Sequence, residues 1–269
     1  MQRIKFALAS IAKQNPMLWA IFWNIGARFE FLLPHDKSYY GFAHFAVPNG
    51  VFLDVGANNG ITALGVQKVL PSYSIFSIEA DPSHRAALER VKRRIPRFQY
   101  EMMGASDVEK SLILYTPYLD RRPIHALTSG DLEYLKVSVV RDFGESKANR
   151  VIYKQQHIRC APLDQLKLSP DIIKVDIEGG ELQALIGLSV TIDRHRPVIM
   201  IEFTPGFSDK AMQYLKAKDY EFFVYEQDGI FSRFRNERDT ETWRRGALQV
   251  NLFSVPREKV AHHFGLLEH

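Results

Sequence analysis

One short stretch of the sequence contains an acid and two glycines, residue types that could bind a small molecule. The stretch is VFLDVGANNG, residues 51–60, in which Asp54 lies in the apolar run and Gly56 and Gly60 come after it. Glycine lets the backbone approach a ligand closely, and a carboxylate accepts hydrogen bonds from amines and hydroxyls. Because an acid would repel a pyrophosphate, the stretch favours a ligand that carries an ammonium or sulfonium group.

A second acid, Glu79, ends the next apolar run, in SIEADP. It follows Gly56 by 23 residues, close to the offset of roughly 20 residues at which an acid holds ribose hydroxyls in dinucleotide-binding folds. The glycine spacing G-x-x-x-G differs from the G-x-G-x-x-G that binds a pyrophosphate. A turn glycine or a capping acid alone needs no ligand, but the ordered set predicts a nucleoside without a diphosphate.

Three further acids, Asp176, Glu178 and Glu202, follow two later apolar runs. Carboxylates that share a crevice repel each other, which raises the pKa of at least one toward the value that a general base needs, or they bind a divalent cation. Either outcome would help to deprotonate an alcohol. The alternative for each acid is a helix cap or an ion pair with Lys174 or Arg196.

Histidine is the other candidate for a general base, because its pKa lies near neutrality. His125, in RRPIHALTSG, is the first candidate and His35 is the second. Arg121 and Arg122 could clamp a phosphate or carboxylate of the substrate, although a solvated loop explains them equally well.

Alternating strand-like and helix-like segments must position these residues. From residue 51 the order is VFLDV, ITALGVQKVL, YSIFSIEA, HRAALERVKRR and FQYEMM, and it resumes with DIIKVDI, a helix near 180–187, PVIMIEF, a helix near 210–217, EFFVYE and ALQVNLFSV. This order predicts an α/β fold with a doubly wound, Rossmann-like parallel sheet, in which ligands bind at the carboxyl ends of the strands. SLILYT and RVIYKQQHIRC predict two more strands, with a largely irregular segment at 117–149 between them.

The chain before residue 48 is predicted to be a helical extension. Leu18, Ile21, Phe22 and Ile25 have the spacing of one helix face, which either covers the main domain as a lid or docks on a membrane or a second subunit. The uncharged run at 14–27 is shorter than the roughly 20 residues that span a bilayer. We therefore expect an extension at 1–47, a main domain at 48–266, and a tag remnant, LEH, at 267–269.

The composition is that of an ordinary globular protein, with 46% hydrophobic and 25% charged residues. A net charge of +4 weakly favours anionic partners. The single cysteine, Cys160, excludes an internal disulfide, and the paired Cys and His spacings of structural zinc sites are missing. These features favour a cytoplasmic protein, and the apolar N-terminal helix could place it at the inner face of the membrane.

The segments FLDVGANNG, SIEADP, LDQLKLSPDIIKVDIEGGELQALIG and RPVIMIEF together resemble the FkbM-type family of class I S-adenosylmethionine-dependent methyltransferases. The resemblance covers about residues 50–204, and IIKVDIEGGE is its most specific part. It implies O-methylation of a hydroxyl on a sugar, glycan or natural-product acceptor. It also implies a seven-stranded sheet of six parallel strands and a last antiparallel strand, for which ALQVNLFSV is the candidate.

The resemblance assigns roles to residues of the motifs. It implies that the methionine part of S-adenosylmethionine is held by Asp54, Gly56, Ala57, Asn58 and Gly60. It further implies that Glu79 holds the ribose, and that Gly104 and Ala105, in MGASD, flank the adenine. The general base would lie beside the cofactor methyl group, and the candidates are Asp176, Glu178, Glu202 and His125.

Two other functions remain as alternatives. The chain could be a non-catalytic adapter that docks through its N-terminal helix, although a degenerate pocket has no need for Asp54, Glu79 and Asp176. It could also be an NAD-dependent oxidoreductase, because Tyr214 and Lys218 have the Tyr-x-x-x-Lys spacing, but the glycine fingerprint of that class is missing. No stretch resembles the NPPY motif that holds a flipped base, so we expect no specific nucleic-acid partner.

Overall fold

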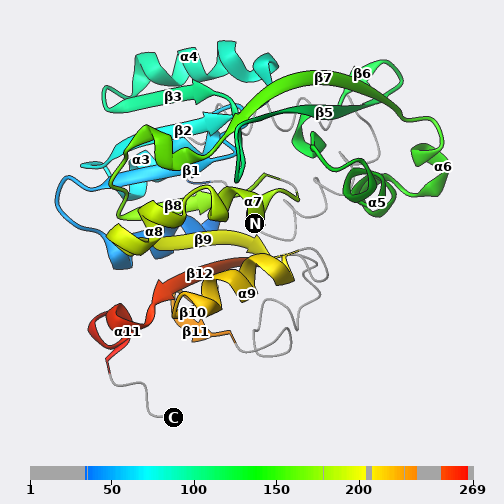
Figure 1. Ribbon diagram of the computed structural model, residues 1–269. Coiled ribbons are helices and arrows are strands. Elements are labelled where there is room, and N and C mark those ends of the chain that lie inside the picture. The colour runs from blue at the N-terminus through cyan, green and yellow to red at the C-terminus, as the bar shows by residue number, and fades with distance from the viewer. Residues whose placement is uncertain are drawn as a thin grey trace.

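The computed structural model describes residues 34, 36–177, 179–203, 208–226, 228–234 and 250–265. These residues form an α/β structure with two sheets (Figure 1). The predicted helix at 18–25, His35, Glu178 and the terminal LEH lie outside the described residues. Among the helices that are described, none combines the length and the apolar composition that crossing a membrane requires.

The main sheet has eight strands in the order β11-β10-β12-β9-β8-β1-β2-β3. Neighbours from β9 to β3 pair in parallel, whereas β12 is antiparallel to both β9 and β10. The strands are β1 (Val51–Val55), β2 (Ser74–Glu79), β3 (Phe98–Met102), β8 (Ile172–Val175), β9 (Val198–Phe203), β10 (Tyr220–Tyr225), β11 (Phe231–Arg233) and β12 (Val250–Pro256). The predicted α/β fold with a late antiparallel strand is confirmed.

The predicted count of seven strands is wrong, because β11 adds an eighth at the edge of the sheet. Gly229, at a φ of +89°, turns the chain back after β10, and β11 then pairs antiparallel with β10. The ring of Phe231 packs against those of Tyr225 and Phe253, at centroid distances of 5.1 Å for both. Aromatic packing of this kind stabilises a short edge strand that its own backbone pairing would hold only weakly.

Helices cover both faces of the main sheet because its inner strands are apolar on both sides. Successive residues of β1 point to opposite faces, so Phe52 enters one core and Leu53 the other. The helices are α3 (Ile61–Val69), α4 (Arg85–Arg94) and α11 (Arg257–Phe264) on the Phe52 side, and α7 (Glu181–Ile186), α8 (Ser189–His195) and α9 (Asp209–Ala217) on the Leu53 side.

A 3-10 helix, η1 (Lys37–Phe45), belongs to the stretch that the sequence assigned to the N-terminal extension. Its Tyr39, Phe42 and Phe45 side chains are buried in the core on the Phe52 side. Phe42 meets the rings of Phe52 and Phe253 at centroid distances of 5.1 and 5.3 Å. This part of the predicted extension therefore packs directly on the sheet, while the boundary at residue 47 stays a prediction.

A second sheet projects from the carboxyl edge of the first (Figure 1). Its strands, in the order β4-β7-β5-β6, are β4 (Gly104–Ala105), β5 (Lys110–Leu119), β6 (Arg122–Pro123) and β7 (Ile152–Ala161). β5 and β7 form a long antiparallel ribbon. The two predicted strands are thus confirmed, in a sheet of their own. We call residues 106–159 the insert.

The prediction of a largely irregular segment at 117–149 is wrong. The insert contains η3 (His125–Leu127), α5 (Leu132–Phe143) and α6 (Glu145–Ala148). Asp131 starts α5 by accepting hydrogen bonds from the backbone N–H groups of Glu133 and Tyr134. Leu135 and Val139, one turn apart, are buried in a small core of the insert, and this burial stabilises the helix.

Candidate functional site

A cavity of about 590 Å³ lies at the carboxyl ends of the main strands and is closed on one side by the insert. It brings together eight of the predicted site residues, which are Gly56, Asn58, Glu79, Gly104, Ala105, His125, Asp176 and Glu202. Asp54 and Ala57 are buried and, like Gly60, do not line the cavity. The position is the one at which parallel α/β sheets bind ligands.

Gly56 allows the end of β1 to pass between β2 and β8. Its φ is +91°, and a Cβ atom there would lie 1.8 Å from the carbonyl oxygen of Asp176. The N–H groups of Gly56 and Ala57 both donate to the carbonyl oxygen of Ile78, at 2.9 and 3.0 Å. Any side chain at this position would therefore push apart the two strand ends that form the cavity floor.

Glu79 is held by the backbone on both carboxylate oxygens. Oε2 accepts from the N–H of Asn58 at 2.6 Å, and Oε1 accepts from the N–H of Asp81 at 2.7 Å. Burial raises the pKa of Glu79 to about 7, although the two hydrogen bonds act in the opposite direction. Each carboxylate oxygen can accept a further hydrogen bond, so Glu79 can receive two vicinal hydroxyls from the cavity.

Asp54 lies beneath the cavity wall within a buried group of charges. Its Oδ2 accepts from the hydroxyl of Ser77 at 3.0 Å. The buried ammonium of Lys174 donates to Oδ2 of Asp176 at 2.8 Å. Burial alone would lower the pKa of Lys174, but the charges of Asp176, Tyr39 and Asp54 raise it above its usual value. Lys174, a cavity residue that sequence reasoning considered only as an ion-pair partner, thus balances buried anionic charge.

Two more cavity residues were not found from the sequence. The hydroxyl of Tyr39 lies 3.2 Å from that of Thr62, and both side chains line the cavity. They come from η1 and from the first turn of α3. Tyr39 is part of a 3-10 helix that brings an aromatic hydroxyl to the sheet edge, and no spacing in KSYYGFAHF indicated which of its two tyrosines would be buried.

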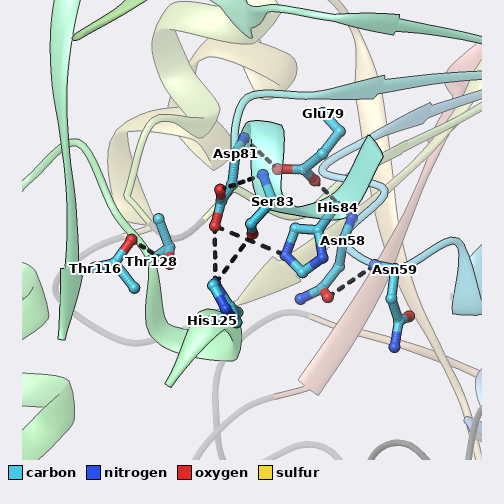
Figure 2. A network of polar contacts seen from close by, with 9 residues as sticks. All are labelled: Asn58, Asn59, Glu79, Asp81, Ser83, His84, Thr116, His125 and Thr128. Carbon is cyan, nitrogen blue, oxygen red and sulfur yellow. Dashed lines mark hydrogen bonds and ion pairs between the residues drawn. The ribbon is translucent and has the colours of Figure 1, made fainter. Parts of the chain in front are cut away.

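A network of polar side chains joins the end of β2 to the insert (Figure 2). Nδ1 of His125 lies 3.0 Å from Oδ2 of Asp81 and 3.2 Å from the hydroxyl of Ser83. Oδ1 of Asp81 accepts from the N–H of Ser83 at 2.9 Å. Nε2 of His84 points toward the same Asp81 oxygen from another side, at 4.0 Å. Sequence reasoning found His125 and missed Asp81 and His84, although both stand in SIEADPSH next to Glu79.

Burial acts on the two buried members of this network in different ways. Burial alone would raise the pKa of Asp81, but the hydrogen bonds from His125 and Ser83 outweigh it and lower the pKa to about 2. Burial lowers the pKa of His84 to about 4, against the attraction of Asp81. At neutral pH the site therefore presents a carboxylate beside an uncharged imidazole.

The remaining candidates occupy separate places. Glu202 of β9 lines the cavity opposite Asn251 of β12. Gly104 pairs with Cys160 of β7, and a Cβ atom on it would meet the Cys160 sulfur at 2.4 Å.

Lys218 pairs with Asp193 at 2.6 Å, outside the residues that line the cavity. The Tyr-x-x-x-Lys spacing is thus not part of the cavity, and Arg121 and Arg122 are exposed beyond its wall.

Comparison with known proteins identifies a family. The family model described as the methyltransferase FkbM domain matches residues 54–222, more than half of the chain. None of the curated proteins compared with the chain is significantly similar to it in sequence.

Several similar solved structures are described as methyltransferases. A methyltransferase FkbM from Methylobacillus flagellatus KT has 16% identity over 90% of this chain, with a TM-score of 0.49, and this chain spans 60% of its length. A precorrin-6y C5,15-methyltransferase from Geobacter metallireducens has 12% identity, a TM-score of 0.42, and coverage of 83% and 89% of the two chains. An Aeropyrum pernix fibrillarin in complex with S-adenosyl-L-methionine has 10% identity, a TM-score of 0.43, and coverage of 81% and 76%.

Proposed function

Because the chain belongs to the FkbM methyltransferase family, we propose that it transfers a methyl group from S-adenosylmethionine to a hydroxyl of an acceptor. The observation that carries the proposal is the placement of Gly56, Asn58 and Glu79 on one wall of the cavity, at the ends of β1 and β2. A nucleoside that lies against this wall would place its ribose on Glu79. The cavity volume is within the range of about 300–1,000 Å³ that is typical of small-molecule sites.

Each part of the cofactor has a proposed partner. The bare backbone at Gly56 and the backbone of Asn58 would border the methionine part, and Gly104 and Ala105 would border the adenine. Asp54, Ala57 and Gly60 lie behind this wall, and we propose that they support it instead of touching the ligand. The acids Asp176 and Glu202 would favour the positive sulfonium over its neutral product.

The reaction is an in-line displacement. The bond between the sulfonium sulfur and the methyl carbon breaks as the bond between that carbon and the acceptor oxygen forms, and the hydroxyl proton passes to a base. Positioning therefore supplies much of the acceleration. Asp176, Glu202 and His125 line the cavity, and together with Glu178 they are the proposed set from which the base comes.

The acceptor would enter between the main sheet and the insert. β5, η3 and α5 supply the cavity wall opposite the proposed cofactor wall, through Leu112, His125 and Asp142 among others. The resemblance of the sequence motifs supports a sugar, glycan or natural-product hydroxyl as the acceptor. A cytoplasmic location, with membrane contact through residues 18–25, is part of the same proposal.

Titration calorimetry with S-adenosylmethionine, and separately with NAD, tests the cofactor. We expect binding of S-adenosylmethionine alone. Glu79→Ala should weaken it by about 10- to 150-fold, because a hydrogen bond to a charged group contributes about 1.5–3 kcal/mol. Glu79→Gln should also weaken it, because the glutamine has one acceptor oxygen for the two backbone N–H groups that Glu79 accepts from.

The control is Glu101→Ala, which removes an exposed acid from the neighbouring strand β3 and should leave the affinity unchanged. If the wild type binds neither ligand, the adapter function takes the place of the enzyme. NAD binding without S-adenosylmethionine binding would instead favour an oxidoreductase.

A further inference from the structure

We propose that Asp81, His84 and His125 form a binding site for one Zn²⁺ ion, which links the end of β2 to the insert. Two imidazole nitrogens and one carboxylate oxygen are a donor set that zinc uses in proteins, whereas Mg²⁺ and Ca²⁺ prefer oxygen alone. The three donor atoms lie within 4.8 Å of one another. Among the described residues, no other three His, Cys, Asp or Glu side chains bring their donor atoms together in this way.

The distances fit a common metal. Zinc lies about 2.0–2.1 Å from nitrogen and oxygen ligands in a tetrahedral arrangement, which separates its ligands by about 3.3 Å. Oδ2 of Asp81 lies 3.0 Å from Nδ1 of His125 and 4.0 Å from Nε2 of His84. These two separations bracket the expected value, so small side-chain rotations would bring all three donors onto one ion.

Hydrogen bonds account for the positions of the Asp81 and His125 side chains but not for that of His84. His125 has Asp81 and Ser83 as partners. The His84 ring is buried, and its nitrogens make no hydrogen bond with any described residue. Oδ2 of Asp81 lies 4.0 Å from Nε2 of His84, which is too far for a hydrogen bond. His84 lines the cavity, so its ring points at the Asp81 carboxylate across a gap that an ion could enter.

The protein already orients the carboxylate. Oδ1 of Asp81 is fixed by the N–H of Ser83, which leaves Oδ2 for the two histidines (Figure 2). His84 ends η2 (Pro82–His84) on the core side, and His125 begins η3 on the insert side. A fixed outer oxygen of this kind strengthens metal binding by holding the ligating oxygen in place.

Ion binding would hold the insert against the main sheet. His84 and His125 are 41 residues apart in the chain, and a metal clip that closes a loop of this length restricts the alternatives of the open chain. The three ligands all line the cavity, so the clip would fix the distance between the cavity walls. Three protein ligands leave a fourth position for water.

Zinc binding does not depend on the proposed methyl transfer, and only its effect on the cavity rests on that function. As a zinc ligand, His125 could not also be the general base. While its Nδ1 binds an ion, the ring does not act as the general base, and the proton would pass to one of the carboxylates of the proposed set. If methyl transfer is lost when the metal is removed, His125 acts as a metal ligand. If methyl transfer survives metal removal, His125 can act as the general base.

The test is calorimetry with ZnCl₂ on the full chain, purified without an oligohistidine tag and treated with a chelator, and visible absorption of added Co²⁺ as a second probe. We expect one ion per chain. Loss of an outer partner of a metal ligand costs about 10- to 100-fold in affinity, so loss of a ligand in His125→Ala or Asp81→Asn should cost more. Asp81→Asn keeps the shape and the acceptor oxygen that caps Ser83, and His125 is 33% exposed at its side chain, so both variants should fold.

His157→Ala, which removes an exposed histidine on β7, is the matched control and should bind zinc like the wild type. Zinc should also slow amide hydrogen exchange in η3 of the wild type and not of His125→Ala. The site is refuted if the wild type binds no ion, or if His125→Ala and Asp81→Asn bind it as tightly as His157→Ala. Calorimetry with S-adenosylmethionine on the metal-free protein is read separately, so a failure of the cofactor leaves the zinc result standing, and the reverse.

Discussion

Replacing Gly56 by alanine should damage both stability and cofactor binding, because the new methyl group has no room. The added Cβ atom would lie 1.8 Å from the carbonyl oxygen of Asp176, whereas real Cβ atoms essentially never come closer than 3.0 Å. The ends of β1 and β8 must therefore move apart by at least 1.2 Å, the difference between these two distances. A misplacement of about 1 Å can cost about 10²-fold in catalytic rate.

The stability cost has two parts that a second variant separates. Gly229→Ala carries a nearly equal backbone penalty, at a φ of +89°, but its Cβ atom meets only the Tyr225 hydroxyl at an ordinary 3.4 Å. A residue in the left-handed region costs about 1–2 kcal/mol, and forcing extra atoms into a packed site adds about 1–3 kcal/mol. We therefore expect losses of about 1–2 kcal/mol for Gly229→Ala and about 2–5 kcal/mol for Gly56→Ala.

Urea unfolding followed by circular dichroism measures the two losses, and calorimetry measures S-adenosylmethionine binding. Gly229→Ala should bind the cofactor like the wild type, because it lies in the β10–β11 hairpin outside the cavity. Gly56→Ala should bind it at least about tenfold more weakly. Equal stability losses in the two variants, together with unchanged cofactor affinity in Gly56→Ala, would refute the argument that Gly56 is required by the close approach of β8.

Three further predictions concern charges and caps. Lys174→Met removes the buried cation that pairs with Asp176 and neighbours the buried Asp54 in the sheet, and breaking this pair should lower the free energy of unfolding by about 3–5 kcal/mol in urea titration; a loss below about 1 kcal/mol would contradict the buried-charge interpretation. Asp164→Ala removes the carboxylate that accepts from two N–H groups at the start of α8, and should cost about 0.5–2 kcal/mol without changing cofactor affinity. Burial lowers the pKa of His263, and His262 and His44 lower it further, so the stability from its neutral ring is present above about pH 6.5 and is lost as the pH falls through the lowered pKa. His263→Asn should flatten this part of the pH profile of thermal unfolding, and an unchanged slope would count against it.

The strands of the main sheet other than β11 were predictable, and four of them, β1, β2, β8 and β10, are short apolar runs that end at or beside a glycine or an acid. The residues at those ends, such as Glu79 and Asp176, follow from the same pattern, since the carboxyl ends of parallel strands meet at one edge. Their surroundings did not follow from it. Asp54 is adjacent in sequence to the cavity turn, yet it is buried, where Ser77 of β2 donates a hydrogen bond to it and the charge of Lys174 on β8 lies beside it.

The helix α5 of the insert was not predicted because its apolar residues do not mark a single face. Leu135 and Val139 face the core of the insert, but Val137 and Val140 are exposed, so apolar residues surround α5 without marking one face. The proposed zinc site could not be found from the sequence for a related reason. Sequence rules for zinc look for paired Cys and His residues close together in the chain, whereas Asp81, His84 and His125 meet only because the insert folds back over β2.

The parallel pairing of β4 with the end of β7 has a consequence for how the acceptor specificity of this protein could evolve. Gly104 and Ala105 lie beside Cys160 and Ala161, so the insert begins and ends at neighbouring points. A segment with adjacent ends can be exchanged for another of different length without disturbing the host fold. The wall proposed to select the acceptor is thus a replaceable module, while the wall proposed for the cofactor belongs to the sheet itself. Related enzymes could acquire new acceptors by exchanging this one segment between two fixed anchor points.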